Sequence, residues 1–515
     1  MSVPTAVRAL FAACCFLVPA LCQDDARAIA AFNKSFAPPP KNKATIDDKK
    51  AALAALAGID NAPAAEALVD GWNDVGVELQ QVDLQRDAAN EELAKLVKGQ
   101  ESAEKRMLPP DALKRFNELK DEVPKLRQRA DALRELQEKV AARVAELRRR
   151  DAALWLLNRV CTNKQRPMRL RLAAAKSVGS SAVDVMPELG AAIARSRDPE
   201  EQVVLLEAAV SAGKAARLHS TPIIALLQSK DDAVAERAAM ALATIAVPEA
   251  IAPVIDLLAR SEGQTQARVA GALEVLSGQQ FGTNVGSWKA WWAAEGAAVA
   301  AGGKALGTGK PSKRSNDGKA YYFGIPQEQS SSILYVIDCS GSMTAKVEMP
   351  NGDGGKRETS RMEATKDELV RALERLRSTQ KFGILWYNDL PHFWEPKLQL
   401  ATKESIARAQ GFVKTLAPAQ STNIHDTLEQ AFTLVGRGSK DKHYGIEFDT
   451  IFLLTDGSPT TADGKADSTD KILLGVRAWN ALKRVTIHTI AIGKDLNASF
   501  LQQLASENGG EFKQY

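Results

Sequence analysis

The C-terminal third of the chain alternates short apolar runs with amphipathic stretches. The runs have the length and composition of buried strands, and the stretches between them repeat apolar residues at helical spacing. This alternation predicts a mostly parallel sheet with helices on both faces, which is a doubly wound α/β domain. The expected strands are 333–337, 382–386, 450–454 and 485–492, and the expected helices are 362–376, 403–416, 424–435, 470–481 and 498–506.

Residues 75–150 carry two stretches in which apolar positions recur every three or four residues, as along a helical seam. Pro109 and Pro110 separate the two stretches, so we expect an antiparallel helical hairpin of the coiled-coil type. Pro124 should kink or divide the second arm because it lacks a backbone donor. A single bent helix remains an alternative. The sequence also leaves open whether the hairpin packs only on itself or serves self-association or partner binding.

Residues 151–296 are rich in alanine and leucine and repeat with a period of about 32 to 34 residues, which is typical of stacked helix pairs. Each unit opens with a capping or acidic residue and continues as an alanine-rich helix. This stretch resembles the short bacterial type of HEAT repeat, and the resemblance implies an α-solenoid. The four units begin near Pro167, Asp198, Asp231 and Gln264.

Three tryptophans follow the last repeat unit at helical spacing: Trp288, Trp291 and Trp292. They could form a recognition patch, but aromatic residues on a terminal helix more often close the open end of a solenoid core, and we expect that role. Residues 297–330 are then rich in glycine, with lysine, serine and alanine, as a flexible linker is. The α/β domain is therefore expected to span residues 331–515.

The N-terminus has the pattern of an export signal over residues 1–22. Arg8 provides a positive start, an apolar stretch follows, and Ala20-Leu21-Cys22 offers small residues for cleavage. An uncleaved anchor and a lipoprotein attached through Cys22 are alternatives. Residues 23–74 form a region whose pattern predicts little. The protein is expected to be exported, to the periplasm or to the cell surface.

Composition excludes several classes of protein. The 67 basic and 63 acidic residues nearly cancel, and the net charge of +4 provides no footprint for nucleic acid. Only Cys161 and Cys339 lie outside the expected signal, so no disulfide framework exists. No later stretch is apolar enough to span a membrane, so no transmembrane segment is expected after signal cleavage.

Polar residues follow the expected strands, where ligands bind in open α/β sheets. Asp338, Ser340 and Ser342 follow the first strand, Thr422 precedes a helix, and Asp456 follows a later strand. With this order of residues the C-terminal domain resembles the von Willebrand factor A family. The family's metal-ion-dependent adhesion site has the pattern DxSxS, then Thr, then Asp, and the five residues occupy those positions. The resemblance implies that the three hydroxyls bind an ion directly and that the carboxylates act directly or through water.

Hydroxyl and carboxylate oxygens suit Mg²⁺ best, with Mn²⁺ or Ca²⁺ as alternatives, and neither histidine nor thiolate is offered to select zinc. Two carboxylates about neutralise a dication, so the ion stays electrophilic and an acidic side chain of a protein partner can complete its coordination. The sequence thus predicts a metal-dependent protein-binding or adhesion protein. The alternative is an assembly scaffold whose helical repeats bind the partner while the metal only stabilises.

Enzyme classes gain no support, because neither HExxH, nor GxSxG, nor a P-loop pattern occurs. Among the scattered histidines, His425 lies nearest to the five residues and is expected on a helix surface. Cys339 is expected to be buried for packing. Residues 344–360 look like an insertion beside the site, either a lid or specificity loop or a solvated segment.

Overall fold

The computed structural model describes residues 23–37, 43–98, 109–181, 185–302, 306–310, 321–327, 329–350, 356–419, 421–434, 447–456, 459–461, 466–493 and 497–515. The expected export signal at 1–22 lies outside these residues, as do the glycines within the 344–360 insertion. The chain forms two compact units, and we describe each by itself. The first comprises 1–195 with 207–212, and the second comprises 196–206 with 213–515.

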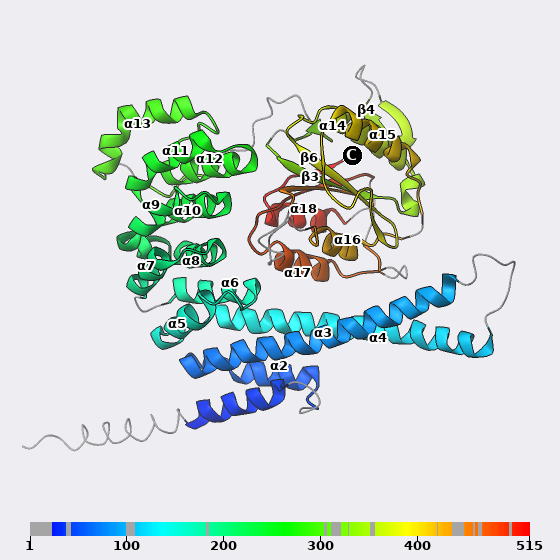
Figure 1. Cartoon of the computed structure of the whole chain (residues 1–515), viewed down its shortest axis with the longest axis horizontal. Helices are drawn as coiled ribbons and strands as arrows, with labels where there is room; N and C mark the ends of the chain where they lie inside the picture. The colour runs from blue at the N-terminus through cyan, green and yellow to red at the C-terminus, as the bar shows by residue number, and fades with distance from the viewer. Residues whose placement is uncertain are drawn as a thin grey trace, which may run out of the picture. The chain divides into compact units, whose positions relative to one another are not determined.

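The first unit contains two long helices, α3 (Ala62–Lys98) and α4 (Pro110–Ala145), with the shorter α2 (Ile46–Ala55). Arg115 on α4 pairs with Glu92 near the end of α3, whereas Arg134 pairs with Asp83 further back. These ion pairs require the two long helices to run antiparallel (Figure 1). The helical stretch begins at Ala62, well before the expected residue 75.

Pro124 lies inside α4, which continues to Ala145. Of the two expected outcomes, a division of the second arm is therefore wrong, and a kink at Pro124 stays a prediction. The side chain of Pro124 is exposed, and so is Lys120 one turn earlier. The carbonyl that loses its helical donor thus lies on the solvent side, where water can replace the missing bond.

A succession of short helices follows α4. In the first unit these are α5 (Arg150–Leu156), α6 (Met168–Gly179) and α7 (Met186–Arg195), and the boundary between the units falls inside α8 (Pro199–Ala212). Trp288 and Trp291 are buried on α13 (Val285–Ala300), the last of these short helices. The Trp288 indole donates to the Gly282 carbonyl at 2.8 Å. The burial of these two residues fits core packing, whereas Trp292 is half-buried. The second unit continues with α9 (Thr221–Leu226), α10 (Asp232–Ile245), α11 (Ile251–Arg260), α12 (Gly263–Ser277) and α13 (Val285–Ala300).

The C-terminal part of the second unit is built on a mixed, mostly parallel sheet. Strand β3 (Ser332–Asp338) lies between β6 (Lys381–Tyr387) and β9 (Thr450–Thr455), and it is parallel to both. Each of the four expected strands is present. The sheet extends beyond β9 through the parallel strands β10 (Thr486–Ala491) and β11 (Phe512–Gln514), and it ends beyond β6 with the antiparallel strands β7 (Pro391–Phe393) and β8 (Gln399–Leu400).

Alternate residues of β3 enter different hydrophobic cores, as the period of a strand requires. Ile333, Tyr335 and Ile337 belong to one core, and Leu334 and Val336 to the other. Helices therefore cover both faces of the sheet, as the pattern predicted (Figure 1). The first core includes α14 (Arg361–Glu374) and α15 (Lys403–Thr415), and the second includes α16 (Ile424–Ala431), α17 (Thr469–Trp479) and α18 (Ala498–Glu507).

The expected insertion at 344–360 contains an antiparallel hairpin of β4 (Lys346–Pro350) and β5 (Lys356–Ser360). A second small hairpin, β1 (Tyr321–Tyr322) with β2 (Ile325–Pro326), precedes β3 and adds Tyr322 to the first core. Neither hairpin was predicted, because strands this short carry too little periodicity. Among the described helices, none combines the length and apolar composition needed to cross a membrane.

Candidate metal site

The candidate site lies at the carboxyl end of β3, the strand from which the chain builds the sheet first to one side and later to the other. After β3 the chain forms α14 and β6 on one side, and it later returns to place β9 on the other side of β3. Such a switch point leaves a crevice outside the carboxyl ends of the strands, where ligands bind in α/β folds. Asp338 is the last residue of β3, and Asp456 follows directly after β9. The topology therefore brings these two distant carboxylates to neighbouring strand ends.

Four of the five predicted residues are joined by hydrogen bonds. Ser342 Oγ donates to Asp456 Oδ1 at 2.7 Å, and the hydroxyl oxygens of Ser340 and Ser342 lie 3.0 Å apart. The backbone amide of Ser340 donates to Asp338 Oδ1 at 2.8 Å. Neighbouring ligands of an octahedral Mg²⁺ are about 3.0 Å apart, because each lies about 2.1 Å from the ion. The spacing and chemistry of these oxygens fit a small, hard dication.

Thr422 is placed by its backbone. Its amide donates to Thr460 Oγ1 at 2.8 Å, and its carbonyl accepts from the Thr460 amide at 2.9 Å. Nearby, the Ala419 amide donates to the Cys339 carbonyl at 2.7 Å, which ties the same loop to the end of β3. Thr422 is 6% exposed. The described hydrogen bonds of Thr422 involve only its backbone. Among the five predicted residues, its side-chain hydroxyl is therefore the group whose orientation is least constrained.

Asp338 is fully buried, and its second oxygen has polar partners. Thr455 Oγ1 donates to Asp338 Oδ2 at 2.7 Å, and the Tyr387 hydroxyl lies 3.4 Å from the same oxygen. Burial, together with the nearby charge of Asp456, raises the pKa of Asp338 to about 6 despite these hydrogen bonds. Two carboxylates close together in a buried site are a costly arrangement that a dication would relieve.

This raised pKa predicts a pH dependence. Cation binding must displace a proton from Asp338 below about pH 6, so Mg²⁺ affinity should fall by up to about tenfold per pH unit there. Without metal, the ionised carboxylate destabilises the fold, and this cost should disappear as pH falls from about 6 to about 4. Thermal melting with and without Mg²⁺, at about pH 5 and about pH 7.5, measures both. An equal Mg²⁺-induced shift at the two pH values would contradict the prediction.

Arg361 belongs to the site but was not anticipated. Its Nη1 donates to Asp456 Oδ2 at 2.9 Å, and the side chains of Arg361 and Asp456 are 13% and 0% exposed. The residue begins α14 directly after the β4–β5 hairpin, and no spacing rule connects it with the DxSxS pattern. Thr455 and Tyr387 were also missed, although Thr455 directly precedes a predicted ligand and could have been considered.

Cys339 is buried in the first core, as expected. Burial, with a contribution from the adjacent Asp338 charge, raises the pKa of the Cys339 thiol to about 12. A thiol in this state is a poor nucleophile and a poor metal ligand. Cys339 therefore serves packing at the end of β3.

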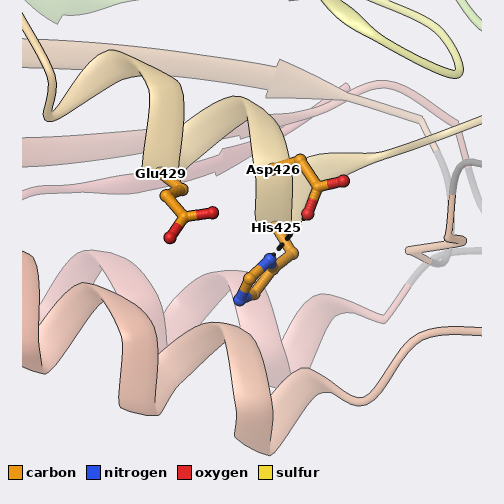
Figure 2. Close-up of side chains that lie close together, drawn as sticks. All are labelled: His425, Asp426 and Glu429. Carbon is orange, nitrogen blue, oxygen red and sulfur yellow. Dashed lines mark hydrogen bonds and ion pairs between the residues drawn. The ribbon is translucent and has the colours of Figure 1, made fainter. Parts of the chain in front are cut away.

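A second group of metal-ligating side chains lies on α16, just after Thr422. Figure 2 shows His425, Asp426 and Glu429, whose ligand atoms lie within 4.8 Å of one another. His425 is 4% exposed and its ring contacts that of Trp479, so its expected place on a helix surface was wrong. Its Nδ1 is bonded to Asp426 Oδ1 at 2.9 Å, and Asp426 Oδ2 accepts from the Asn423 side chain. These bonds account for the arrangement of His425 and Asp426 without an ion.

The fold and the polar cluster together define a doubly wound α/β domain with an oxygen-lined site at its switch point. Residues 352–513 match the family model described as von Willebrand factor type A domain. The C-terminal part of the chain is therefore a domain of this family. The matched stretch begins after Asp338, Ser340 and Ser342, so it includes Thr422 and Asp456 but not the DxSxS pattern.

Among curated proteins, the chain is 29% identical over 190 residues to inter-alpha-trypsin inhibitor heavy chain H3 of Bos taurus, which covers 36% of this chain and 19% of that protein. The heavy chain H2 of Mus musculus is 28% identical over 182 residues, with 35% and 17% covered. The chain thus spans less than a fifth of the length of these curated relatives.

Two solved structures are also similar. A von Willebrand factor type A protein from Catenulispora acidiphila is 20% identical, covers 36% of this chain and 38% of that chain, and gives a TM-score of 0.28. The proximal thread matrix protein 1 of the mussel byssus, with a zinc-occupied MIDAS motif, is 20% identical and covers 36% of this chain and 41% of that chain, with a TM-score of 0.26.

Proposed function

We propose that this protein is an exported binding protein that uses a divalent cation in its C-terminal domain to capture an acidic group of a protein partner. The observation that carries the proposal is the cluster of Asp338, Ser340, Ser342 and Asp456 at the switch point of the sheet. A protein-interaction role is supported by the family of the domain and by its curated relatives.

Mg²⁺ is the cation we propose, with Mn²⁺ or Ca²⁺ as alternatives. Asp338, Ser340, Ser342 and Asp456 would hold it through oxygen atoms, and Thr422 would supply a further hydroxyl. The bound ion would act as a Lewis acid toward a carboxylate oxygen of the partner. Ser342 is exposed whereas Asp338 is buried. This difference in exposure supports an ion that is held on its protein side and keeps an open coordination position toward solvent.

The remaining parts of the chain would direct export and would position the binding domain for contact with its partner. In this proposal residues 1–22 direct export, the helical repeats span 151–296, and 297–330 link them to the binding domain. No catalytic role is proposed. Cys339 is buried and the pKa of its thiol is raised, so it offers no ready nucleophile beside Asp338.

An assembly scaffold is the second candidate function. It is favoured by the extent of α3 and α4, 37 and 36 residues, which is more than a small intramolecular brace requires. Helices of this length reach about 55 Å at about 1.5 Å per residue and offer a long lateral surface for a partner or a second copy. In that case the cation would only stabilise the domain.

The two candidates differ in how partner capture responds to the cation. The immobilised full chain should retain a partner from the exported fraction in Mg²⁺ and release at least about nine-tenths of it with chelator or in Asp338→Ala. An excess of glutarate should compete, since it offers the same carboxylate. Asp470→Ala, which removes an exposed carboxylate at the start of α17, is the matched control and should bind normally. Partner capture that is unchanged by chelator and by Asp338→Ala would favour the scaffold.

A further inference from the structure

Arg361 is fixed to the loop that carries the two serines. Its backbone amide donates to the Ala345 carbonyl at 2.8 Å, and Ala345 directly follows the short 3₁₀ turn of Gly341–Thr344. Ser360 caps the same helix by accepting from the Glu363 amide at 3.1 Å. The start of α14 is therefore capped and is hydrogen-bonded to the end of the DxSxS loop, which places the Arg361 backbone next to the loop that carries the two serines.

The fold reserves space for the guanidinium. Gly493 follows β10 with φ of +117°, and a Cβ at this position would overlap the Arg361 guanidinium. Arg361 Nε is buried and has no hydrogen-bond partner in the described part of the chain. One buried donor of the guanidinium is thus left unpaired, which is energetically costly. Its described hydrogen bond is the one to Asp456 Oδ2. A purely structural arginine would be expected to satisfy more of its donors.

The charge of the site follows from these contacts. Asp338 and Asp456 carry two formal negative charges, and Arg361, which pairs with Asp456, carries one formal positive charge. The site without metal then carries about −1, and a bound dication would bring it to about +1. Without Arg361 the occupied site would be neutral.

We infer that the positive charge of Arg361 weakens cation binding at this site and strengthens binding of an anionic ligand to the bound cation. This inference rests on the proposed metal-dependent function. Its fixed positive charge opposes the incoming dication, and the same charge leaves the occupied site attractive to a carboxylate. Because the guanidinium is almost buried, salt screens it less than it would screen a surface charge. The ligand class that the site selects is accordingly a carboxylate and not a neutral hydroxyl or amide.

Arg361→Met tests the inference, because methionine has similar bulk and no charge. Mn²⁺ serves as the probe ion, since its binding is measured directly by electron paramagnetic resonance or calorimetry. Acetate binding to the Mn²⁺-loaded protein is then followed by water proton relaxation. We expect Arg361→Met to bind Mn²⁺ about tenfold more tightly and acetate about tenfold more weakly than the unmodified protein. Arg361→Lys keeps the charge and should restore both affinities to within a few-fold.

The two affinities must change in opposite directions. A residue that only orients Asp456 would lower Mn²⁺ affinity when replaced, so weaker or unchanged Mn²⁺ binding in Arg361→Met overturns the inference. Circular dichroism with saturating Mn²⁺ identifies any variant that fails to fold, and Arg361→Gln then replaces it in the same measurements. If the unmodified protein binds Mn²⁺ no better than Asp338→Ala, the proposed function itself fails, which is a separate result.

Discussion

Asp338→Asn is expected to make the protein more stable without divalent cations and to abolish its stabilisation by Mg²⁺. Burial and the nearby charge of Asp456 raise the pKa of the Asp338 carboxyl from an ordinary value of 3.8 to about 6, and this difference reflects the cost of its charged form. A difference of about two pKa units corresponds to at most about 3 kcal/mol at neutral pH. An amide removes the charge but accepts fewer hydrogen bonds, so a gain of about 1–2 kcal/mol is expected.

Chemical denaturation of the full chain in chelator and in saturating Mg²⁺ measures both effects. The unmodified protein should gain stability with Mg²⁺, and Asp338→Asn should gain almost none, because its affinity should fall by at least about a hundredfold. Asp449→Asn is the matched control. Asp449 is half-buried and burial raises its pKa, but it precedes β9, whereas Asp456 follows this strand. If Asp338→Asn retained the full Mg²⁺ response, Asp338 would not be a ligand.

Much of the C-terminal fold could be predicted because its strands are buried on both faces. Continuous apolar runs such as 450–454 carry their own signal, and the amphipathic helices between them restrict the topology to a few arrangements. Asp338 and Asp456 then follow from position alone, since both stand at carboxyl ends of parallel strands. The pattern could not reveal that β3 and β9 are neighbours, although the site depends on this pairing.

Arg361 shows what the sequence left out. Its contact with Asp456 crosses 95 positions of the chain and depends on the β4–β5 hairpin, whose short strands show little pattern. His425 was assigned to the wrong environment for a related reason. A histidine is polar in any hydrophobicity pattern, and only the packing of α16 against α17 shows that its ring is covered by Trp479.

A second large effect is expected in the first unit. Glu78→Ala should destabilise this unit by about 3–5 kcal/mol. Glu78 on α3 binds Lys49 on α2 and also accepts from Arg129 on α4 at 2.9 Å. The side chains of Lys49 and Glu78 are 3% and 7% exposed. Burial alone would raise the pKa of Glu78, but the hydrogen bonds from Lys49 and Arg129 lower it overall. Removal of the carboxylate would leave the Lys49 ammonium buried without its partner.

Hydrogen exchange of the full chain, read on peptides from α3 and α4, locates this loss in the first unit. The double variant Lys49→Met with Glu78→Leu is the control, because it replaces both charges with apolar groups of similar size and should recover most of the stability. If Glu78→Ala behaved like the double variant, the Lys49 ammonium would have found water or another partner. The result also bears on function: a stable ion pair across three helices fixes their register, and a scaffold that presents α3 and α4 to a partner needs that register to be unique.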